Sequence, residues 1–288
     1  MSTHPARSLW HSMEIVHDVT YFAPEVRDTG LRLGLKGFWM TYFAFRAAPL
    51  GPVGPGVVTA TFAGFHPDWV SKALPAAWDI AGPSVCLDAR AEVAARVLRA
   101  VGVTDEVADR SADALAPVAA GADPTGRPLY AANAEVAPPA DPVARLWQLT
   151  ATLREHRGDG HIAAYVAAGL SGMQAQLLQV AAGHYPAELV RGIRGWSEAE
   201  WTAGVRQLAE RGLLDGSGAF TDAGRALLDG IESRTDELAW AGGLARLGED
   251  GAAEVVELMR PAVHAVSASG VLPRTNPTGV PLPTETSA

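Results

Sequence analysis

Two pairs of acidic and histidine residues are the side chains of this sequence best suited to chemistry. The first pair, Glu14 and His17, lies three residues apart in the segment 8–22. The apolar spacing of this segment predicts a helix, and residues three apart share one helix face. A carboxylate beside an imidazole can transfer protons, or hold a metal ion when a second such pair exists, which this sequence lacks. The alternative is a half-buried histidine that the carboxylate orients.

The second pair is Asp159 and His161, in the segment HRGDGH at 156–161. Glycines flank the aspartate and predict that one helix stops before them and a new helix starts, with Asp159 as its cap. An interrupted helix exposes backbone donors and aims side chains into a cavity, so His156, Asp159 and His161 become candidate site residues. The alternative is that Asp159 only caps the helix and His161 packs in its first turn.

Aromatic residues indicate what these pairs would act on. The segment 34–48, GLKGFWMTYFAFRAA, is almost wholly apolar and predicts a helix that is either core or the wall of a cavity for an apolar or aromatic ligand. We therefore expect Glu14, His17, Asp159 and His161 to be catalytic residues around one cavity. The residues expected to bind the ligand are Tyr21, Phe38, Trp39, Tyr42, Arg46 and His156.

A carboxylate neighbour should raise the pKa of His17. Ligand affinity or activity would then change between about pH 5 and 8, the interval in which histidine ordinarily titrates.

Other catalytic patterns are missing from the sequence. It has no Gly-x-Ser-x-Gly elbow and no phosphate loop, since GPVGPG at 51–56 carries prolines where free amides are needed. Cys86 is the only cysteine, which excludes an internal disulfide and a thiolate zinc cluster and fits a reducing cytoplasm. The sequence does not identify a metal or a cofactor, and both stay open. It also has no signal segment and no apolar run long enough to span a membrane, so we expect a cytoplasmic protein with no membrane partner.

The clearest secondary-structure pattern lies towards the C-terminus. Ser197 and Glu200 form a capping box, which predicts a helix that ends at Gly212. Two very short strands around a glycine-rich turn follow within 213–220, and Thr221 caps a second helix. This order of cap, helix, small wing, cap and helix is typical of the second half of a winged helix.

With these residues the sequence resembles, along nearly its whole length, an actinobacterial family of helix-turn-helix proteins that is MarR-like in its C-terminal half. The resemblance rests on GFWMTYFAFRAAPLGPVG (37–54), on LREHRGDGHIAA (153–164), and on RGWSEAEW (194–201) with the wing that follows. It implies a mainly α-helical, tandem or decorated winged-helix architecture with a small β-wing. The family is uncharacterised and places no catalytic role on any position.

Proline content and periodicity predict the domain organisation. Six prolines lie between residues 117 and 142, where helical periodicity disappears. A weak internal echo, GLKGF against GLSGM, leaves a degenerate winged helix open for the N-terminal half. The predicted parts are an N-terminal helical domain (1–116), a proline-rich connector (117–142), a C-terminal winged-helix domain (143–266) and an extended tail (267–288).

The acidic charge of the chain argues against DNA binding without excluding it. The net charge is -9, and residues 151–250 contain nine arginines and fourteen acidic residues, whereas DNA-binding faces are normally strongly positive. Arg191, Arg194 and Arg206 are the candidate DNA contacts, and a dimer could gather them on one side.

Two functions remain open. The leading one is a ligand-responsive transcriptional regulator or sensor that holds a small apolar or aromatic molecule between its halves. The alternative is a winged-helix-derived enzyme or ligand-sequestering protein that no longer binds DNA and uses a His/Glu/Asp pocket for acid–base or metal chemistry. The cap–helix–wing order favours the first, and the acidic charge favours the second. Apolar Leu227, Ile231 and Leu238 on the helix after the wing predict a homodimer.

Overall fold

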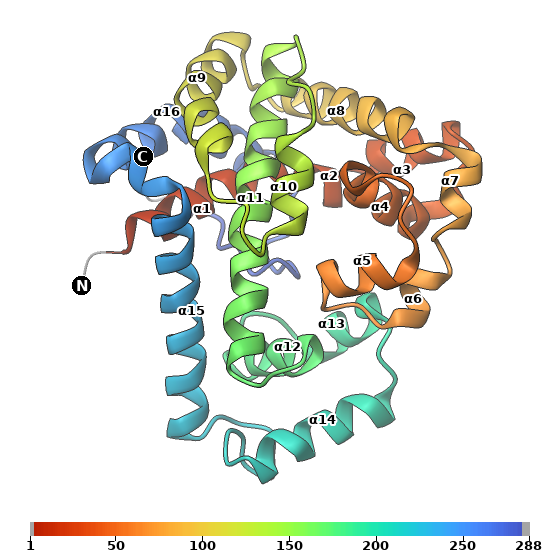
Figure 1. The fold of residues 1–288 in the computed structure, drawn as a ribbon, viewed down its shortest axis with the longest axis vertical. Helices are drawn as coiled ribbons and strands as arrows, with labels where there is room; N and C mark the ends of the chain where they lie inside the picture. The colour runs from red at the N-terminus through yellow and green to blue at the C-terminus, as the bar shows by residue number, and fades with distance from the viewer. Residues whose placement is uncertain (1–2, 284–288) are drawn as a thin grey trace.

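Residues 3–283, which the computed structural model describes, fold almost entirely into α-helices and the turns between them (Figure 1). The helices of the first half are α1 (Pro5–His17), α2 (Val19–Phe22), α3 (Pro24–Arg32), α4 (Gly37–Ala47), α5 (Pro55–Phe62), α6 (Pro67–Ser71), α7 (Ala76–Ile80), α8 (Pro83–Ala100), α9 (Asp105–Gly121) and α10 (Pro128–Ala134). Those of the second half are α11 (Pro142–Ala167), α12 (Gly172–Ala181), α13 (Ala187–Arg194), α14 (Glu198–Glu210), α15 (Asp222–Gly242) and α16 (Gly248–Ser269). The short 3-10 helices are η1 (Ala48–Leu50) and η2 (Leu244–Leu247). The predicted mainly α-helical class is confirmed.

Helix α11 runs through the centre of the molecule (Figure 1). Its start follows from the sequence, because Pro142 occupies the first turn and the Asp141 carboxylate accepts a hydrogen bond from the Ala144 amide at 2.8 Å. Helices α1, α8, α9, α10 and α15 all pack against it. Residues on every side of α11 are therefore buried, and its polar side chains must find partners inside the protein.

The predicted break of this helix at Gly158-Asp159-Gly160 is wrong, since α11 is continuous from Pro142 to Ala167. Packing explains why Gly160 is there: a Cβ at this position would lie 2.7 Å from Nη1 of Arg127. The Arg127 guanidinium crosses α11 at this point and donates to the carbonyl of His156 and, at 2.9 Å, to that of Leu238. A tertiary contact thus overrides the low helix propensity of glycine.

The predicted helix caps in the C-terminal half are observed. Ser197 and Glu200 form the capping box at the start of α14, and the Thr221 hydroxyl accepts from the Gly224 amide at 3.1 Å. The predicted strands are not observed within residues 3–283, where Leu214 and Phe220 form one isolated antiparallel bridge. The Asp215 carboxylate closes the turn between them, so the segment predicted as a wing is a capped loop that is too short for a strand ladder.

Proline-rich segments of the chain, including the predicted connector, contain helices. The proline-rich segment 117–142 carries the last turn of α9 and all of α10, and the Tyr130 hydroxyl in α10 donates to the carbonyls of Ala119 and Ala122. The segment 49–56 contains the end of η1 and the start of α5. The division into two domains stays a prediction.

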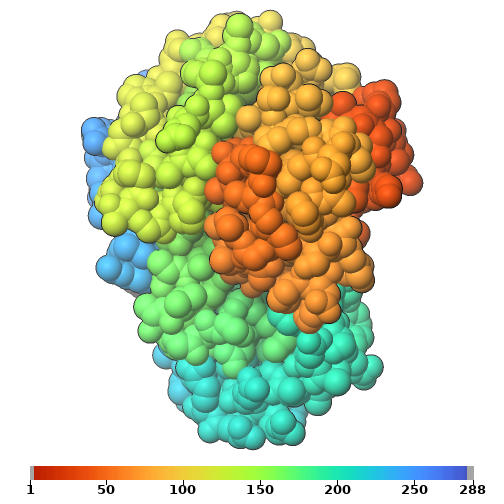
Figure 2. Space-filling view, turned by 45° about the vertical axis from the view of Figure 1, so that its right-hand side comes forward, coloured from red at the N-terminus to blue at the C-terminus, as the bar shows by residue number. Residues whose placement is uncertain are grey.

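Apolar side chains form two clusters. The main core is built largely from α1, α4, α8, α9, α11 and α16, and includes Leu9, Phe43 and Trp147. The second core lies around α12, α14 and α15, and includes Leu178 and Leu208. In the space-filling view, the helices of the second core form one end of the molecule and lie directly against N-terminal segments (Figure 2).

The contact between these two parts centres on residues 63–66. The His66 amide donates to the carbonyl of Arg194 at 2.9 Å, and Nε1 of Trp196 donates to the carbonyl of Gly64 at 3.1 Å. Gly172 packs so closely that a Cβ there would lie 2.0 Å from the carbonyl oxygen of Ala63.

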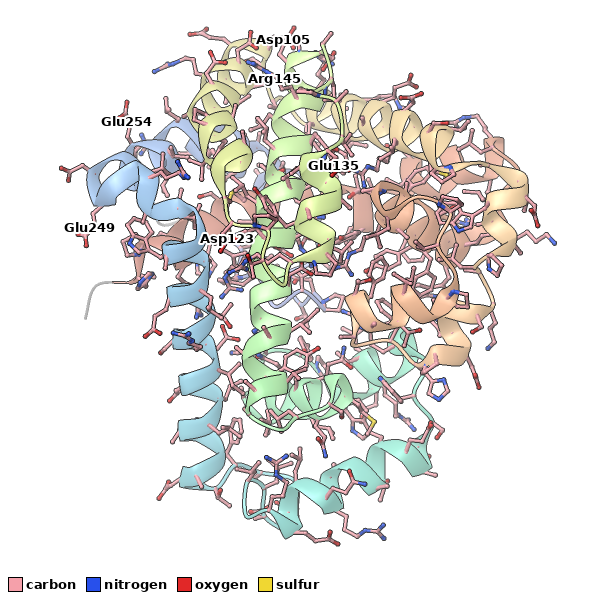
Figure 3. All side chains as sticks on the ribbon, viewed as in Figure 1. Asp105, Asp123, Glu135, Arg145, Glu249 and Glu254 are labelled. Carbon is pink, nitrogen blue, oxygen red and sulfur yellow. The ribbon has the colours of Figure 1, made fainter. Side chains whose placement is uncertain are left out.

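Charged residues cover the outside, including the end of the molecule opposite α14, where Arg145 and Asp105 are labelled (Figure 3). Arg145 lies 3.1 Å from Asp109 and 2.8 Å from Asp113 of α9. These are exposed ion pairs, which contribute about 0–1 kcal/mol each.

Candidate functional site

A cavity of about 770 Å³ lies between the main core and the second core. Residues of α1, α4 and α11 form one side, residues of α12 and α13 form the other, and the chain after α16 covers part of it. The volume is within the range of pockets that hold drug-sized molecules. The cavity is therefore the first candidate for a site.

One wall of the cavity is aromatic. Phe38, Trp39, Tyr42 and Phe65 line it, with ring centroids 5.0 Å apart for Phe38 and Trp39 and 5.5 Å apart for Tyr42 and Phe65. These edge-on and tilted arrangements are those that aromatic rings prefer. The structure places Phe38, Trp39 and Tyr42 together, and Tyr21 joins them at 5.2 Å from Tyr42.

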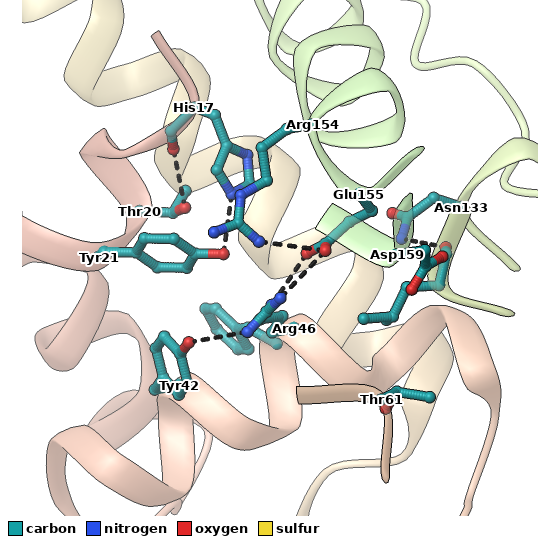
Figure 4. Close-up of polar contacts among 12 residues, drawn as sticks. His17, Thr20, Tyr21, Tyr42, Arg46, Thr61, Asn133, Arg154, Glu155 and Asp159 are labelled. Atoms are coloured by element: carbon teal, nitrogen blue, oxygen red, sulfur yellow. Dashed lines mark hydrogen bonds and ion pairs between the residues drawn. The ribbon is translucent and has the colours of Figure 1, made fainter. Parts of the chain in front are cut away.

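A buried network of ion pairs forms another part of the lining (Figure 4). Nε and Nη2 of Arg46 donate to the two carboxylate oxygens of Glu155 at 2.9 and 3.0 Å. Nη1 of Arg154 donates to Glu155 at 3.1 Å, and its Nε donates to Glu14 at 3.1 Å. Glu155 and Glu14 are each 3 % exposed at the side chain. The two arginines hold the pKa of Glu155 far below its usual range against the effect of burial, so this carboxylate is ionised.

His17 lies behind this lining. Its Nε2 is 2.9 Å from the Tyr21 hydroxyl, and its ring stacks on Trp147 at 5.8 Å. His17 lines a separate void of only about 20 Å³, while Tyr21 reaches both this void and the large cavity. The expected rise in the pKa of His17 is wrong: burial, and then the charge of Arg154, hold this pKa well below its usual value.

His161 does reach the cavity, from the same helix as Arg154 and Glu155. Its Nδ1 is 3.1 Å from the Thr235 hydroxyl and 3.9 Å from Glu232. Burial lowers the pKa of His161, and the Glu232 carboxylate only partly offsets it. The imidazole is therefore neutral near pH 7.

Asp159 and His156 face away from the cavity. Asp159 accepts a hydrogen bond from the Tyr130 amide at 3.0 Å and so caps α10 rather than its own helix. His156 is 1 % exposed and packs edge-on against the Tyr130 ring at 4.9 Å. Residues two apart on a continuous helix point about 200° apart, so Asp159 and His161 cannot share a site on α11.

The structure therefore brings together one half of each predicted pair. Glu14 and His161 line the same cavity as Tyr21, Phe38, Trp39, Tyr42 and Arg46. His17 lies one layer behind it, and Asp159 and His156 do not line it.

The arginines of this site were not predicted, apart from Arg46. Arg154 and Arg157 line the cavity from α11, and Arg7 lines it from α1. Arg157 is held by Asp236 at 3.1 Å and Arg7 by the same carboxylate at 2.8 Å. Helical spacing would have found the first two, because Arg154, Arg157 and His161 are three and four residues apart and share a face once α11 is continuous.

The chain after α16 also reaches the cavity, where Pro273, Thr275 and Thr278 line it. The Thr278 hydroxyl donates at 2.7 Å to Asp18, which is fully buried between α1 and α2. Burial, and then the charge of Glu14, raise the pKa of Asp18 well above its usual range. The part of the predicted tail that lies outside the described residues is 284–288.

The three candidate DNA contacts lie in different environments. Arg206 is exposed on α14, 3.8 Å from Glu210, and Arg191 lies 3.6 Å from Glu198. Arg194, at the end of α13, lines the cavity instead, and its guanidinium carbon lies 4.2 Å from the centre of the Phe65 ring.

Residues 3–283 show neither a metal-binding cluster nor a membrane-spanning helix. No group of three or more His, Cys, Asp or Glu side chains there is arranged to hold a metal ion. None of the helices in this range combines the length and the apolar character that crossing a membrane requires.

Comparison with protein-family models matches residues 6–273 of the chain to a family described as the Helix-turn-helix family. No curated protein and no solved structure matches the chain.

Proposed function

Because the chain belongs to the Helix-turn-helix family, we propose that it is a ligand-responsive transcriptional regulator of winged-helix type. Family membership indicates a DNA-binding kind of role. The cavity carries the ligand part of the proposal. Its second wall is built from α12 and α13, the two helices that directly precede α14 in the chain. A molecule in the cavity would therefore contact the segment that orients α14.

The order α12, α13, α14, turn and α15 supports a winged helix of the MarR-like kind, with a wing reduced to one bridge. In this proposal α14 is the recognition helix. Its exposed side chains include Arg206, Thr202 and Gln207, which can contact phosphates or base edges.

The test of DNA binding uses labelled DNA from upstream of the gene that encodes this chain and fluorescence anisotropy at low salt. Arg206→Ala should weaken binding and reduce the slope of log affinity against log salt by about one, because one phosphate contact is lost. Arg260→Ala is the matched control, since Arg260 is equally exposed on α16 and also pairs with a helix neighbour, Glu257. Failure of the parent protein to bind this DNA at low salt refutes the regulator.

The second candidate is a winged-helix-derived enzyme or ligand-sequestering protein that does not bind DNA. The acidic partners of the surface arginines favour it, because Glu198 and Glu210 lie beside Arg191 and Arg206 and would repel phosphates. Ligand binding by a protein that fails the DNA test would select this candidate.

A homodimer through α15 belongs to the first proposal. Ile231 of α15 is buried in the second core, and Leu227 and Leu238 pack against that core, so these three residues are largely covered within one chain. Light scattering at tens of micromolar protein distinguishes a dimer from a monomer.

A further inference from the structure

The charge of the cavity differs from that of the whole chain. The chain has a net charge of -9, yet five arginines and three glutamates line the cavity. The arginines are Arg7, Arg46, Arg154, Arg157 and Arg194, and the glutamates are Glu14, Glu155 and Glu232. His11 and His161 add no positive charge to this lining at neutral pH, because burial lowers the pKa of His11 to about 4 and also lowers that of His161.

Four of the five arginines have carboxylate partners. Arg46 and Arg154 lie against Glu155, and Arg154 also holds Glu14. On the other side, Arg7 and Arg157 each contact both Glu232 and Asp236. Each of these groups contains two arginines and two carboxylates and is balanced in charge.

Arg194 is the exception. Within residues 3–283 its guanidinium has no carboxylate within ion-pair distance and no partner for Nη1 or Nη2. One face of the guanidinium covers the Phe65 ring. The Gln176 amide, oriented so that its nitrogen donates to the carbonyl of Gly64, accepts from Nε at 3.2 Å. Among the residues that the structure describes, nothing occupies the two terminal nitrogens of Arg194, which can donate to a ligand at the edge of the aromatic wall.

We propose that the cavity binds an organic anion with a large aromatic or fused-ring body, whose acidic group is held by Arg194 and whose rings lie on Trp39 and Tyr42 of the aromatic wall. Guanidinium is suited to this because its two terminal nitrogens can donate in parallel to a carboxylate or a group of similar geometry. A body of several rings matches about 770 Å³. This inference deepens the ligand half of the proposed regulator and rests on it.

The position of Arg194 also explains how such an anion would act on α14. Arg194 is the last residue of α13, and its own carbonyl accepts from the His66 amide at 2.9 Å. Gly195 follows in the left-handed conformation, with φ of 80°, and Ser197 then caps α14. A charge bound at Arg194 therefore acts at the turn that sets the angle between α13 and α14.

Two probes that differ by one charged group test the anion. Anilinonaphthalene sulfonate is an aromatic anion, and phenylnaphthylamine has the same rings without the sulfonate. Both become fluorescent in an apolar site. The parent protein should bind the sulfonate at least about tenfold more tightly, since hydrogen bonds to charged groups contribute enough for a factor of about ten to a hundred. Because the chain is strongly acidic, nonspecific surface binding would favour the opposite order.

Arg194→Gln should reduce the affinity for the sulfonate about tenfold or more and leave that for the neutral probe nearly unchanged. Arg194→Lys keeps the charge and should fall between Gln and the parent. Arg191→Gln is the matched control, because it is three residues earlier on the same helix and does not line the cavity. Equal binding of both probes by the parent, or an equal loss of both probes in Arg194→Gln, overturns the proposal. If the Gln variant does not fold, the Arg194→Lys variant and the preference of the parent protein for the sulfonate over the neutral probe still test the proposal.

The result of the probe experiment does not depend on whether the protein binds DNA. A protein that prefers the anion through Arg194 but binds no DNA supports this inference and refutes the regulator. A protein that binds its upstream DNA but shows no preference for the anion refutes this inference alone.

Discussion

Replacing Glu155 by glutamine should be one of the most destabilising single changes of a charged residue in this protein. The side chain of Glu155 is 3 % exposed, and its partners Arg46 and Arg154 are 11 % and 16 % exposed. It accepts three hydrogen bonds of 2.9 to 3.1 Å from these guanidinium groups. A glutamine keeps the shape but removes the charge, and it turns an NH₂ group towards arginine donors.

The size of the effect follows from burial. Removing one partner of a buried ion pair leaves an uncompensated charge and costs about 3–5 kcal/mol. Domains are stable by about 5–15 kcal/mol in total, so Glu155→Gln should lose a large fraction of the free energy of unfolding. The measurement is a urea titration followed by far-ultraviolet circular dichroism.

Asp113→Asn is the control, because it breaks an ion pair of 2.8 Å with Arg145 whose Asp113 side chain is 72 % exposed. Its cost should stay below about 1 kcal/mol. Adding Arg46→Gln to Glu155→Gln should cost less than the sum of the two single changes, since they remove opposite charges from one contact. A Glu155→Gln variant that is as stable as the Asp113→Asn control would refute the assignment of this network as a buried, charged cluster.

Two further changes test the reasoning about α11 and about the contact between the cores. Burial raises the pKa of Asp159 to about 7, so the folded chain keeps a proton that the unfolded chain loses above about pH 4, and stability falls as the pH rises from about 4 to 7. Asp159→Asn should flatten this fall in urea titrations, and equal pH dependence in both proteins contradicts the assignment. Gly172→Ala places a Cβ 2.0 Å from the Ala63 carbonyl and should lower the melting temperature by the equivalent of about 1–3 kcal/mol. Gly192→Ala, at an exposed position of α13 with no atom within 4 Å of the added Cβ, should instead leave the melting temperature unchanged or raise it. A similar loss in both variants would contradict the proposed close contact.

The sequence predicted the structure correctly where a side chain forms a hydrogen bond with a residue close to it in the chain. The predicted capping residues Ser197 and Thr221 each accept from an amide three residues later. The mainly helical class follows from the same signals. The wing was over-predicted because a turn pattern indicates where the chain reverses, but the length of the ladder depends on packing that the pattern does not contain.

Long-range contacts account for what the sequence did not reveal. Gly158 and Gly160 have low helix propensity, and only the crossing of Arg127 over α11 shows why a glycine stands inside an unbroken helix. That error moved Asp159 into the predicted site and kept Arg154 out of it. The partners of Arg154 also lie far away in the chain, since Glu14 is 140 residues distant. Spacing along one helix cannot reveal a partner on another.

Two segments that each begin with a glycine and an aromatic residue, GFHPDW at 64–69 and GWSEAEW at 195–201, meet in space. The first residues of these segments precede α6 and α14, and each initial glycine lies against a tryptophan of the other segment. Trp196 donates to the carbonyl of Gly64, and a Cβ on Gly195 would lie 2.9 Å from Trp69. The Trp196 ring also packs edge-on against His66 at 4.9 Å, and Nε2 of His66 lies 3.0 Å from Glu200 of the capping box of α14.

The contact between these two segments connects the cavity to α14. Phe65 in the first segment and Arg194 beside the second are in contact with each other and line the cavity. A ligand that displaces the Arg194 guanidinium from the Phe65 ring would loosen a cation–π contact of about 0.5–2 kcal/mol. That amount is comparable to the coupling free energy of about 1–3 kcal/mol found between typical allosteric sites. In the proposed regulator, a small molecule would need no large rearrangement to change the orientation of α14, because the contact it replaces already joins the two halves.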